Sequence, residues 1–233
     1  GEDEIAAATR LFERVVARYP RAFDTVSGDA LYLNPAFCRL ARRHGKYFIA
    51  VLKNENRDLV VDARSLFPLT EPHRWTEGHT DIEAWDIPDL TTWTQYGKPV
   101  RVVRTLETHP VRRQRTKEVM PEKAEWMWGT NIPLWKAPRD VIVRLGHGRW
   151  SIENQGFNEI VHAWHGDHIY KNHPNAIAAC YLLLFLAYNL FHAFFTRDLK
   201  PALRAAYTMA FLVEKIRAAF YEAVPLHARG RPP

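Results

Sequence analysis

An apolar segment over residues 176–195 limits the folds that the chain can adopt, because so much hydrocarbon surface has to be removed from water. A helix of this length is almost long enough to cross a bilayer. However, Asn189 and His192 lie inside the segment, and Arg197 and Lys200 follow it. Mixed aromatic and polar residues are more typical of a core helix, so we expect an almost wholly buried helix and no membrane partner. A membrane-spanning helix is the alternative.

Before residue 68, helical and strand-like patterns alternate along the chain. Residues 2–18 repeat apolar side chains at helical spacing, and Pro20 marks their end. Residues 46–53 are aromatic and β-branched between polar ends, which is typical of a strand. This alternation predicts an α/β fold, with residues 1–67 as its first part. By the same criteria, the other elements expected in this part are a strand at 23–27 and helices at 34–44 and 54–67.

Residues 68–123 have a different character, with prolines, tryptophans and short alternating runs in place of helical periods. The runs HTDIEAWDI and KPVRVVRTLET alternate apolar and polar residues, as a half-buried strand does. The sequence therefore predicts an inserted antiparallel β-region at this point in the chain.

Seven Lys or Arg residues lie between Lys98 and Lys117 in this region, against a single acid, Glu107. The net charge of +6 for the whole chain also suits a protein that binds a polyanion. Two interpretations stay open, a hairpin that contacts phosphates and a solvated basic face. The candidate DNA contacts in the cluster are Arg101, Arg104, Arg112, Arg113, Arg115 and Lys117.

Residues 124–174 are expected to form a return strand followed by helices. Trp126 and Trp128 lie on one face of the strand, where they form either a stacked core pair or a platform for DNA bases. A helix is predicted from Pro138 to residue 145 and another at 149–163. The remaining predictions are helices at 175–195 and 200–224, which together make a C-terminal region over 175–224, and a disordered tail at 225–233.

Two carboxylates stand on either side of the basic region. Asp29 directly follows a strand and Gly28, where open α/β sheets bind ligands, although it could instead cap the next helix. Glu153 lies one helical turn after Arg149, and Gly156 beside it leaves room for a phosphate or a metal ion. Two magnesium ions held by carboxylates can cut or join phosphodiesters. An arginine can neutralise the charge of the phosphate backbone.

Several other chemistries have weaker support. His162, His165 and His168 are three residues apart, which distributes them around a helix and does not gather them on one face as a zinc site requires. The sequence has no P-loop, dinucleotide-binding fingerprint or nucleophile elbow. Cys38 and Cys180 do not make a disulfide framework, which favours a reducing compartment.

The segments GDALYLNPAF, YFIAVLKNENRDL, EWMWGTN, GRWSIENQGFNE, WHGDHIY and FFTRDLKPALR resemble those of bacterial DDE transposases of the cut-and-paste type. The resemblance implies an RNase H-like catalytic core with a β-strand insertion and C-terminal helices. It also implies two magnesium or manganese ions, double-stranded DNA of transposon ends as the partner, a homodimer, and a cytoplasmic, nucleoid-associated location in bacteria. Its function would be metal-dependent DNA strand cleavage and strand transfer.

By this resemblance Asp29 is the second catalytic Asp, which follows the fourth core strand, and Glu153 is the catalytic Glu. Both would be metal ligands. Arg149 would be the arginine of the family's Tyr–Arg–Glu–Lys signature and a DNA contact. In that signature Gly146 replaces the tyrosine and Ile160 replaces the lysine. The residues considered as substitutes for these two DNA contacts are His147, Asn154 and Asn158.

The family's first catalytic Asp has no counterpart here, because residues 2–18 match the helix that follows the first three core strands. We therefore expect a C-terminal portion of a transposase that lacks those strands, is inactive alone and exposes an unpaired sheet edge. The alternative is a non-catalytic DNA-binding remnant or domesticated module, in which the basic region persists without carboxylate chemistry.

Overall fold

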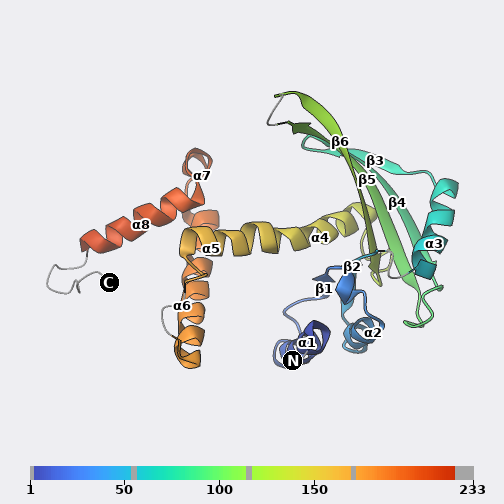
Figure 1. Ribbon diagram of the computed structural model, residues 1–233, viewed down its shortest axis with the longest axis horizontal. Helices are drawn as coiled ribbons and strands as arrows, with labels where there is room; N and C mark the ends of the chain where they lie inside the picture. The colour runs from blue at the N-terminus through green and yellow to red at the C-terminus, as the bar shows by residue number, and fades with distance from the viewer. Residues whose placement is uncertain (1–2, 54–56, 114–116, 169–171, 224–233) are drawn as a thin grey trace. The chain divides into compact units, whose positions relative to one another are not determined.

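The computed structural model describes residues 3–53, 57–113, 117–168 and 172–223 (Figure 1). These divide into two compact units, Gly1–Arg149 and Trp150–Pro233, each of which is described by itself. The tail expected at 225–233 lies outside the described residues. The first unit is an α/β structure built on one mixed six-stranded sheet, and the second unit is helical.

The sheet has the strand order β1-β2-β6-β5-β4-β3. β1 and β2 are parallel, and all the other neighbouring pairs are antiparallel. β6 pairs with β5 along its length and with β2 at its end, so the β-rich region continues the parallel pair as one sheet. β1 has a partner on one side and forms an edge of the sheet. The strands are β1 (Thr25–Gly28), β2 (Tyr47–Val51), β3 (His73–Glu77), β4 (Thr80–Leu90), β5 (Val100–Arg112) and β6 (Val119–Thr130).

Two helices of the first unit, α1 and α2, begin and end close to the residues that the sequence predicts. Asp3 Oδ1 accepts the N–H of Ala6 at 2.7 Å, and Asn34 Oδ1 accepts that of Ala36 at 2.9 Å, which caps α1 and α2. Gly45 follows α2 with a φ of +68°, a conformation that glycine adopts without strain. The helices are α1 (Glu4–Arg18), η1 (Ala30–Tyr32), α2 (Pro35–Arg43), α3 (Arg57–Leu66), η3 (Phe67–Leu69) and α4 (Arg139–Ser151). α4 runs through Gly146 and Gly148, where the sequence had predicted a break.

Alternation along the strands gives the sheet two apolar faces. Phe48 and Ala50 of β2 face a cluster that includes Cys38 of α2 and Leu59 of α3. The intervening Ile49 and Val51 face the opposite cluster, which Ile142 and Val143 of α4 complete. Helices therefore cover both faces of the sheet, with α4 on the side away from α2 and α3. The side chains that join α1 to α2 are Phe12, Val16, Phe37, Leu40 and Ala41.

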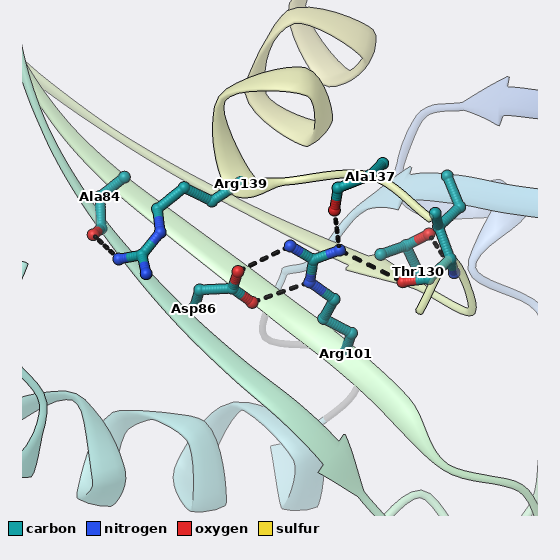
Figure 2. A network of polar contacts seen from close by, with 7 residues as sticks. Ala84, Asp86, Arg101, Thr130, Ala137 and Arg139 are labelled. Atoms are coloured by element: carbon teal, nitrogen blue, oxygen red, sulfur yellow. Dashed lines mark hydrogen bonds and ion pairs between the residues drawn. The ribbon is translucent and has the colours of Figure 1, made fainter. Parts of the chain in front are cut away.

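A buried ion pair fixes the start of α4 against the sheet (Figure 2). Arg101 of β5 donates from Nε and Nη2 to the two carboxylate oxygens of Asp86 on β4, at 2.8 and 2.6 Å. Its Nη1 donates to the carbonyl oxygens of Ala137 at 2.7 Å and Ile132 at 3.3 Å. One arginine thus joins two strands to the loop that leads into α4.

The second unit consists of short and long helices. Phe191 is the buried residue of α6, so the expectation of an almost wholly buried apolar helix is wrong for the described residues. The segment Pro174–Asp198 is long and apolar enough to cross a membrane by length and composition alone, with a mean hydropathy of 1.8. The helix predicted at 200–224 is two helices, because Tyr207 is extended and Thr208 caps the second one. The elements are η4 (Ile152–Phe157), α5 (Asn158–Trp164), α6 (Pro174–Ala193), η5 (Phe194–Asp198), α7 (Pro201–Ala206) and α8 (Met209–Ala223).

Candidate functional site

Asp29 lies directly after β1, at the carboxyl end of the parallel pair β1 and β2. Its Oδ1 accepts the backbone N–H of Leu31 at 2.9 Å and thereby caps η1. Capping and ligand binding were alternatives for this residue, and the capping bond is present. It occupies one oxygen, and among the described residues no donor bonds Oδ2. Asp29 also lines an open hollow of about 390 Å³ together with Asn34 and Lys53.

Arg149 and Glu153 lie one turn apart across the end of α4. Arg149 is half-buried in the last turn, and Glu153 is exposed in η4. η4 winds as a π-helix, a local departure from α-helical geometry that occurs frequently at functional sites. A Cβ placed on Gly156 would meet, among the described residues outside its own helical turn, one atom within 4.0 Å, the carbonyl oxygen of Ser151. The small residue therefore leaves open space on the same turn as Glu153.

The two carboxylates belong to different units of the structure. Asp29 lies in the first unit, and Glu153 lies four residues after Arg149, the last residue of that unit. Each carboxylate has a defined local setting, and the pairing of the two stays a prediction. Across the described ranges, no three His, Cys, Asp or Glu side chains gather in a way that could hold a metal ion.

The histidines that follow Glu153 serve a helix end. His165 closes α5 in the left-handed conformation, with a φ of 52°. Its carbonyl oxygen accepts the backbone N–H of His168 at 3.1 Å, and the N–H of Gly166 bonds the carbonyl of Ile160 at 2.9 Å. His162 is exposed on α5. The local structure is a helix terminus with its carbonyl groups satisfied.

Arg101, predicted to contact DNA, is a core residue and is unavailable to a phosphate. Its side chain is 3% exposed, and its charge is neutralised by Asp86. Arg101 lies between Val100 and Val102 on an alternating strand. Its side chain therefore points to the α4 face of the sheet and not to solvent. Arg104 is also held within the structure, because it bonds Glu125 at 2.8 Å and lies 4.7 Å from the ring centroid of Trp85.

The remaining basic residues of the cluster lie at the tip of the β5–β6 hairpin. Arg112 ends β5, Arg113 follows it, and Lys117 precedes β6. All three are exposed. The N–H of Lys117 bonds the carbonyl of Arg113 at 2.9 Å, which closes the turn. Arg115 lies outside the described residues. In the predicted cluster, Arg101 is therefore buried and Arg104 is paired with Glu125. The residues at the hairpin tip are exposed.

Trp126 and Trp128 stack on each other, with ring centroids 6.3 Å apart and planes 10° from parallel. Trp128 is 1% exposed, and Trp126 is half-buried. Both face α4, where His147 meets the two rings edge-on. Of the two interpretations given above, the stacked core pair describes Trp128, because a ring beneath a helix cannot reach a DNA base.

A polar network that the sequence did not indicate lies beside these rings. Glu107 of β5 is 9% exposed, and its Oε1 accepts hydrogen bonds from His147 Nε2 and Thr105 Oγ1, both at 2.7 Å. Burial alone would raise the pKa of Glu107, but the bonds from His147 and Thr105 lower it below its ordinary value. His147 therefore connects α4 to the sheet. The available signal was that Glu107 is the single acid in a basic stretch.

The two positions at which the sequence departs from the signature of the family that it resembles are both buried. Gly146 lies against Trp128, where any side chain would collide with the indole. Ile160 is 7% exposed and packs against Gly166 within the second unit. His147, a candidate substitute, is bonded to Glu107. The other two candidates, Asn154 and Asn158, are exposed on the helix that carries Glu153.

Comparisons with known proteins give no family. No protein-family model matches the chain, and no curated protein matches it. Among solved structures, it is similar to an S-adenosylmethionine-dependent methyltransferase from Clostridium acetobutylicum ATCC 824, with 12% identity and a TM-score of 0.16. The alignment covers 55% of this chain and 47% of that one, so the chain spans about half the length of the structure it matches. A likeness this weak supports no inference about fold or activity.

Proposed function

We propose that the chain is part of a DDE transposase, in which Asp29 and Glu153 are two carboxylates of a metal-dependent site that cuts and joins DNA. The order of the elements carries the proposal. A strand is followed by Asp29, then by a helix, a parallel strand, an antiparallel β-region and the helix that leads to Glu153. This is the order that the resemblance implies for the second half of an RNase H-like core with its insertion.

Local geometry supports the assignment of the two carboxylates. Asp29 has one oxygen in the cap and lines an open hollow, and Glu153 is exposed next to the space at Gly156. Carboxylate oxygens are the ligands that magnesium and manganese prefer. Asp29 and Glu153 would hold such ions, which supply activation of the attacking oxygen and stabilisation of the leaving oxygen. Arg149, one turn before Glu153, would bind a backbone phosphate.

In the complete enzyme, the family's first Asp would lie on a strand that is not among these 233 residues. The outer edge of β1 fits that arrangement, since an edge strand offers unpaired backbone groups to another strand. We expect the chain alone to bind metal weakly and to lack transposition activity. Its partner would be duplex DNA, and its activity in the complete enzyme would be strand cleavage and strand transfer.

Localised oxidative cleavage tests whether the two carboxylates share a metal ion. Ferrous iron bound in place of magnesium reduces added hydrogen peroxide to hydroxide and a hydroxyl radical, and the radical cuts nearby backbone. We therefore expect cuts close to both Asp29 and Glu153. Excess magnesium should suppress the cuts, and Asp29→Asn should remove those near Glu153 as well. Asp24→Asn, an exposed aspartate before β1, is the matched control. Cuts near Glu153 that survive Asp29→Asn would contradict the shared site.

A non-catalytic DNA-binding module is the second candidate, and the exposed basic tip of the β5–β6 hairpin favours it. Such a module needs Arg112, Arg113 and Lys117 but neither carboxylate. In an assay of magnesium-dependent cleavage of transposon-end DNA, robust activity that Asp29→Ala leaves intact would eliminate the transposase assignment. DNA binding that Glu153→Gln does not change, together with no shared metal, would favour the module.

A further inference from the structure

A hollow of about 600 Å³ in the first unit is lined by basic residues that the candidate site does not use. Three of them, Arg39, Arg42 and Arg43, come from α2, and Lys98 comes from the loop before β5. Ala36 and Tyr96 complete the lining. Both parts of the lining lie in the same unit, and they are more than fifty residues apart in sequence.

The amphipathic character of α2 places its arginines together. Phe37, Cys38, Leu40 and Ala41 are buried, which turns the other side of the helix to solvent. Arg39, Arg42 and Arg43 are spaced at i, i+3 and i+4, so they share that outer face. All three are exposed, as is Lys98.

The hollow contains no compensating negative charge. Within the described part of the chain, none of its four cationic side chains forms an ion pair with a carboxylate. The Arg39 guanidinium donates to the carbonyl oxygen of Gln95, which holds the 91–99 loop against α2. Arg42 also borders a neighbouring hollow that includes Asp89, without an ion pair between them. Like charges placed this close repel one another, and a bound anion would relieve that repulsion.

Tyr96 gives the hollow a polar group whose proton lacks an acceptor. Its side chain is 2% exposed, with the ring packed edge-on against Phe48 and tilted against Trp93. Burial raises the pKa of the hydroxyl, against hydrogen bonding and charge from Arg42, so the hydroxyl stays neutral. Arg42 can only donate, and among the described residues no acceptor bonds the buried hydroxyl proton. A buried donor left without an acceptor costs roughly 1–3 kcal/mol, which an acceptor in the hollow would recover.

We propose that this hollow binds a phosphate group of a DNA backbone, with Arg39, Arg42, Arg43 and Lys98 as cationic contacts and the Tyr96 hydroxyl as a neutral donor. Guanidinium groups bind phosphate oxygens through two parallel hydrogen bonds, and several around one oxyanion give both affinity and orientation. The oxygens of a phosphate group offer enough acceptors for this donor set. The inference takes duplex DNA as the polyanion from the proposed function, but it involves neither Asp29 nor Glu153.

Binding of a fluorescent DNA duplex, followed by anisotropy at several salt concentrations, tests the assignment. We expect Arg42→Gln to weaken binding about tenfold, the loss typical of one charged hydrogen-bonded contact. It should also reduce the slope of log affinity against log salt by about 0.9, the value for one phosphate contact. Arg14→Gln, which removes the same charge from an exposed site on α1, is the matched control. An equal loss in Arg14→Gln would mean that only bulk charge matters and would overturn the site.

Tyr96→Phe separates binding from folding. This change removes only the hydroxyl, whose proton has no acceptor in the described structure, so thermal stability should be unchanged or higher while affinity for DNA falls several-fold. Unchanged affinity in Tyr96→Phe would exclude the hydroxyl as a donor to DNA. Inorganic phosphate distinguishes the two sources of the anion. If phosphate stabilises the wild type but not Tyr96→Phe, and every variant binds DNA equally, the hollow takes free phosphate and the DNA assignment fails.

These readouts are independent of the metal site. The metal site is read by localised cleavage near Asp29 and Glu153, and the hollow is read by the DNA affinity of Arg42→Gln and Tyr96→Phe. A chain with no shared metal but with DNA affinity that depends on Arg42 and Tyr96 would refute the catalytic proposal and uphold the phosphate site. A shared metal ion together with DNA affinity that does not depend on Arg42 or Tyr96 would uphold the catalytic proposal and refute the phosphate site.

Discussion

Gly146 of α4 lies directly on the indole of Trp128, so close that a Cβ at this position would be 2.4 Å from the ring nitrogen Nε1 and from Cε2. The backbone of α4 meets the sheet here with only the indole of Trp128 between them. This contact sets the height of α4 above β6, and the residues that lead to Glu153 continue from that helix. A residue with a side chain would not fit at this position, and this includes the tyrosine of the family that the sequence resembles.

The glycines of α4 provide a matched pair of substitutions. Gly146→Ala should lower the free energy of unfolding by about 1–2 kcal/mol, since overpacking against Trp128 outweighs the better helix propensity of alanine. Gly148→Ala has no described atom within 4 Å of its new Cβ and should raise stability by about 0.5–1 kcal/mol. Urea unfolding followed by tryptophan fluorescence measures both. Equal effects of the same sign would contradict the close contact.

The buried pair of Arg101 and Asp86 should be far more sensitive to mutation than an exposed pair in the same sheet. Arg101→Met leaves the Asp86 carboxylate buried without its partner and should cost about 3–5 kcal/mol of stability. Arg74→Met breaks the exposed pair with Glu83 and should cost far less, because water screens an exposed ion pair. Thermal unfolding of the two variants gives the comparison. A cost for Arg101→Met as small as that for Arg74→Met would show that the pair is not buried in solution.

Glu107 should make stability depend on pH in the acid range. Its pKa is lowered in the folded protein, so it contributes stability at pH values above its ordinary pKa and loses that contribution as the pH falls through the folded value. We expect the free energy of unfolding to fall less steeply below about pH 4.5 in Glu107→Gln than in the wild type. Denaturant unfolding between pH 3 and pH 7 measures the slope. The exposed Glu13→Gln should leave it unchanged, and an equal flattening there would attribute the effect to net charge.

Elements that depend on neighbouring residues were predictable from the sequence. Asn34, Pro35 and Gly45 mark the ends of α2 because capping, proline geometry and positive φ are local properties. The alternating runs identified the antiparallel strands for the same reason. β6 was harder to delimit, because pairing with both β5 and β2 makes one continuous strand of residues that the sequence assigns to an insertion and a return strand.

Properties that depend on distant partners were not predictable. Arg101 has the composition of a basic surface, and only its register opposite Asp86 makes it a core residue. The hollow lined by Arg39, Arg42, Arg43 and Lys98 needs Tyr96 to lie beside α2, which no local pattern indicates. The apolar run of α6 was assigned to a core by composition, yet most of its surface is exposed in the described unit. Tertiary contacts, not residue type, decide each of these cases.

The β5–β6 hairpin has a consequence for the size of a DNA footprint. β5 runs from Val100 to Arg112 at the exposed tip. Lys98, which lines the hollow beside α2, lies two residues before Val100. Thirteen residues of strand extend about 40 Å, and one turn of B-form DNA rises roughly 34–36 Å. A duplex in contact with both ends of this strand would therefore be held at phosphates about one helical turn apart, on the same side of the double helix. The length of β5 would then set the distance between the two contacts with the DNA backbone.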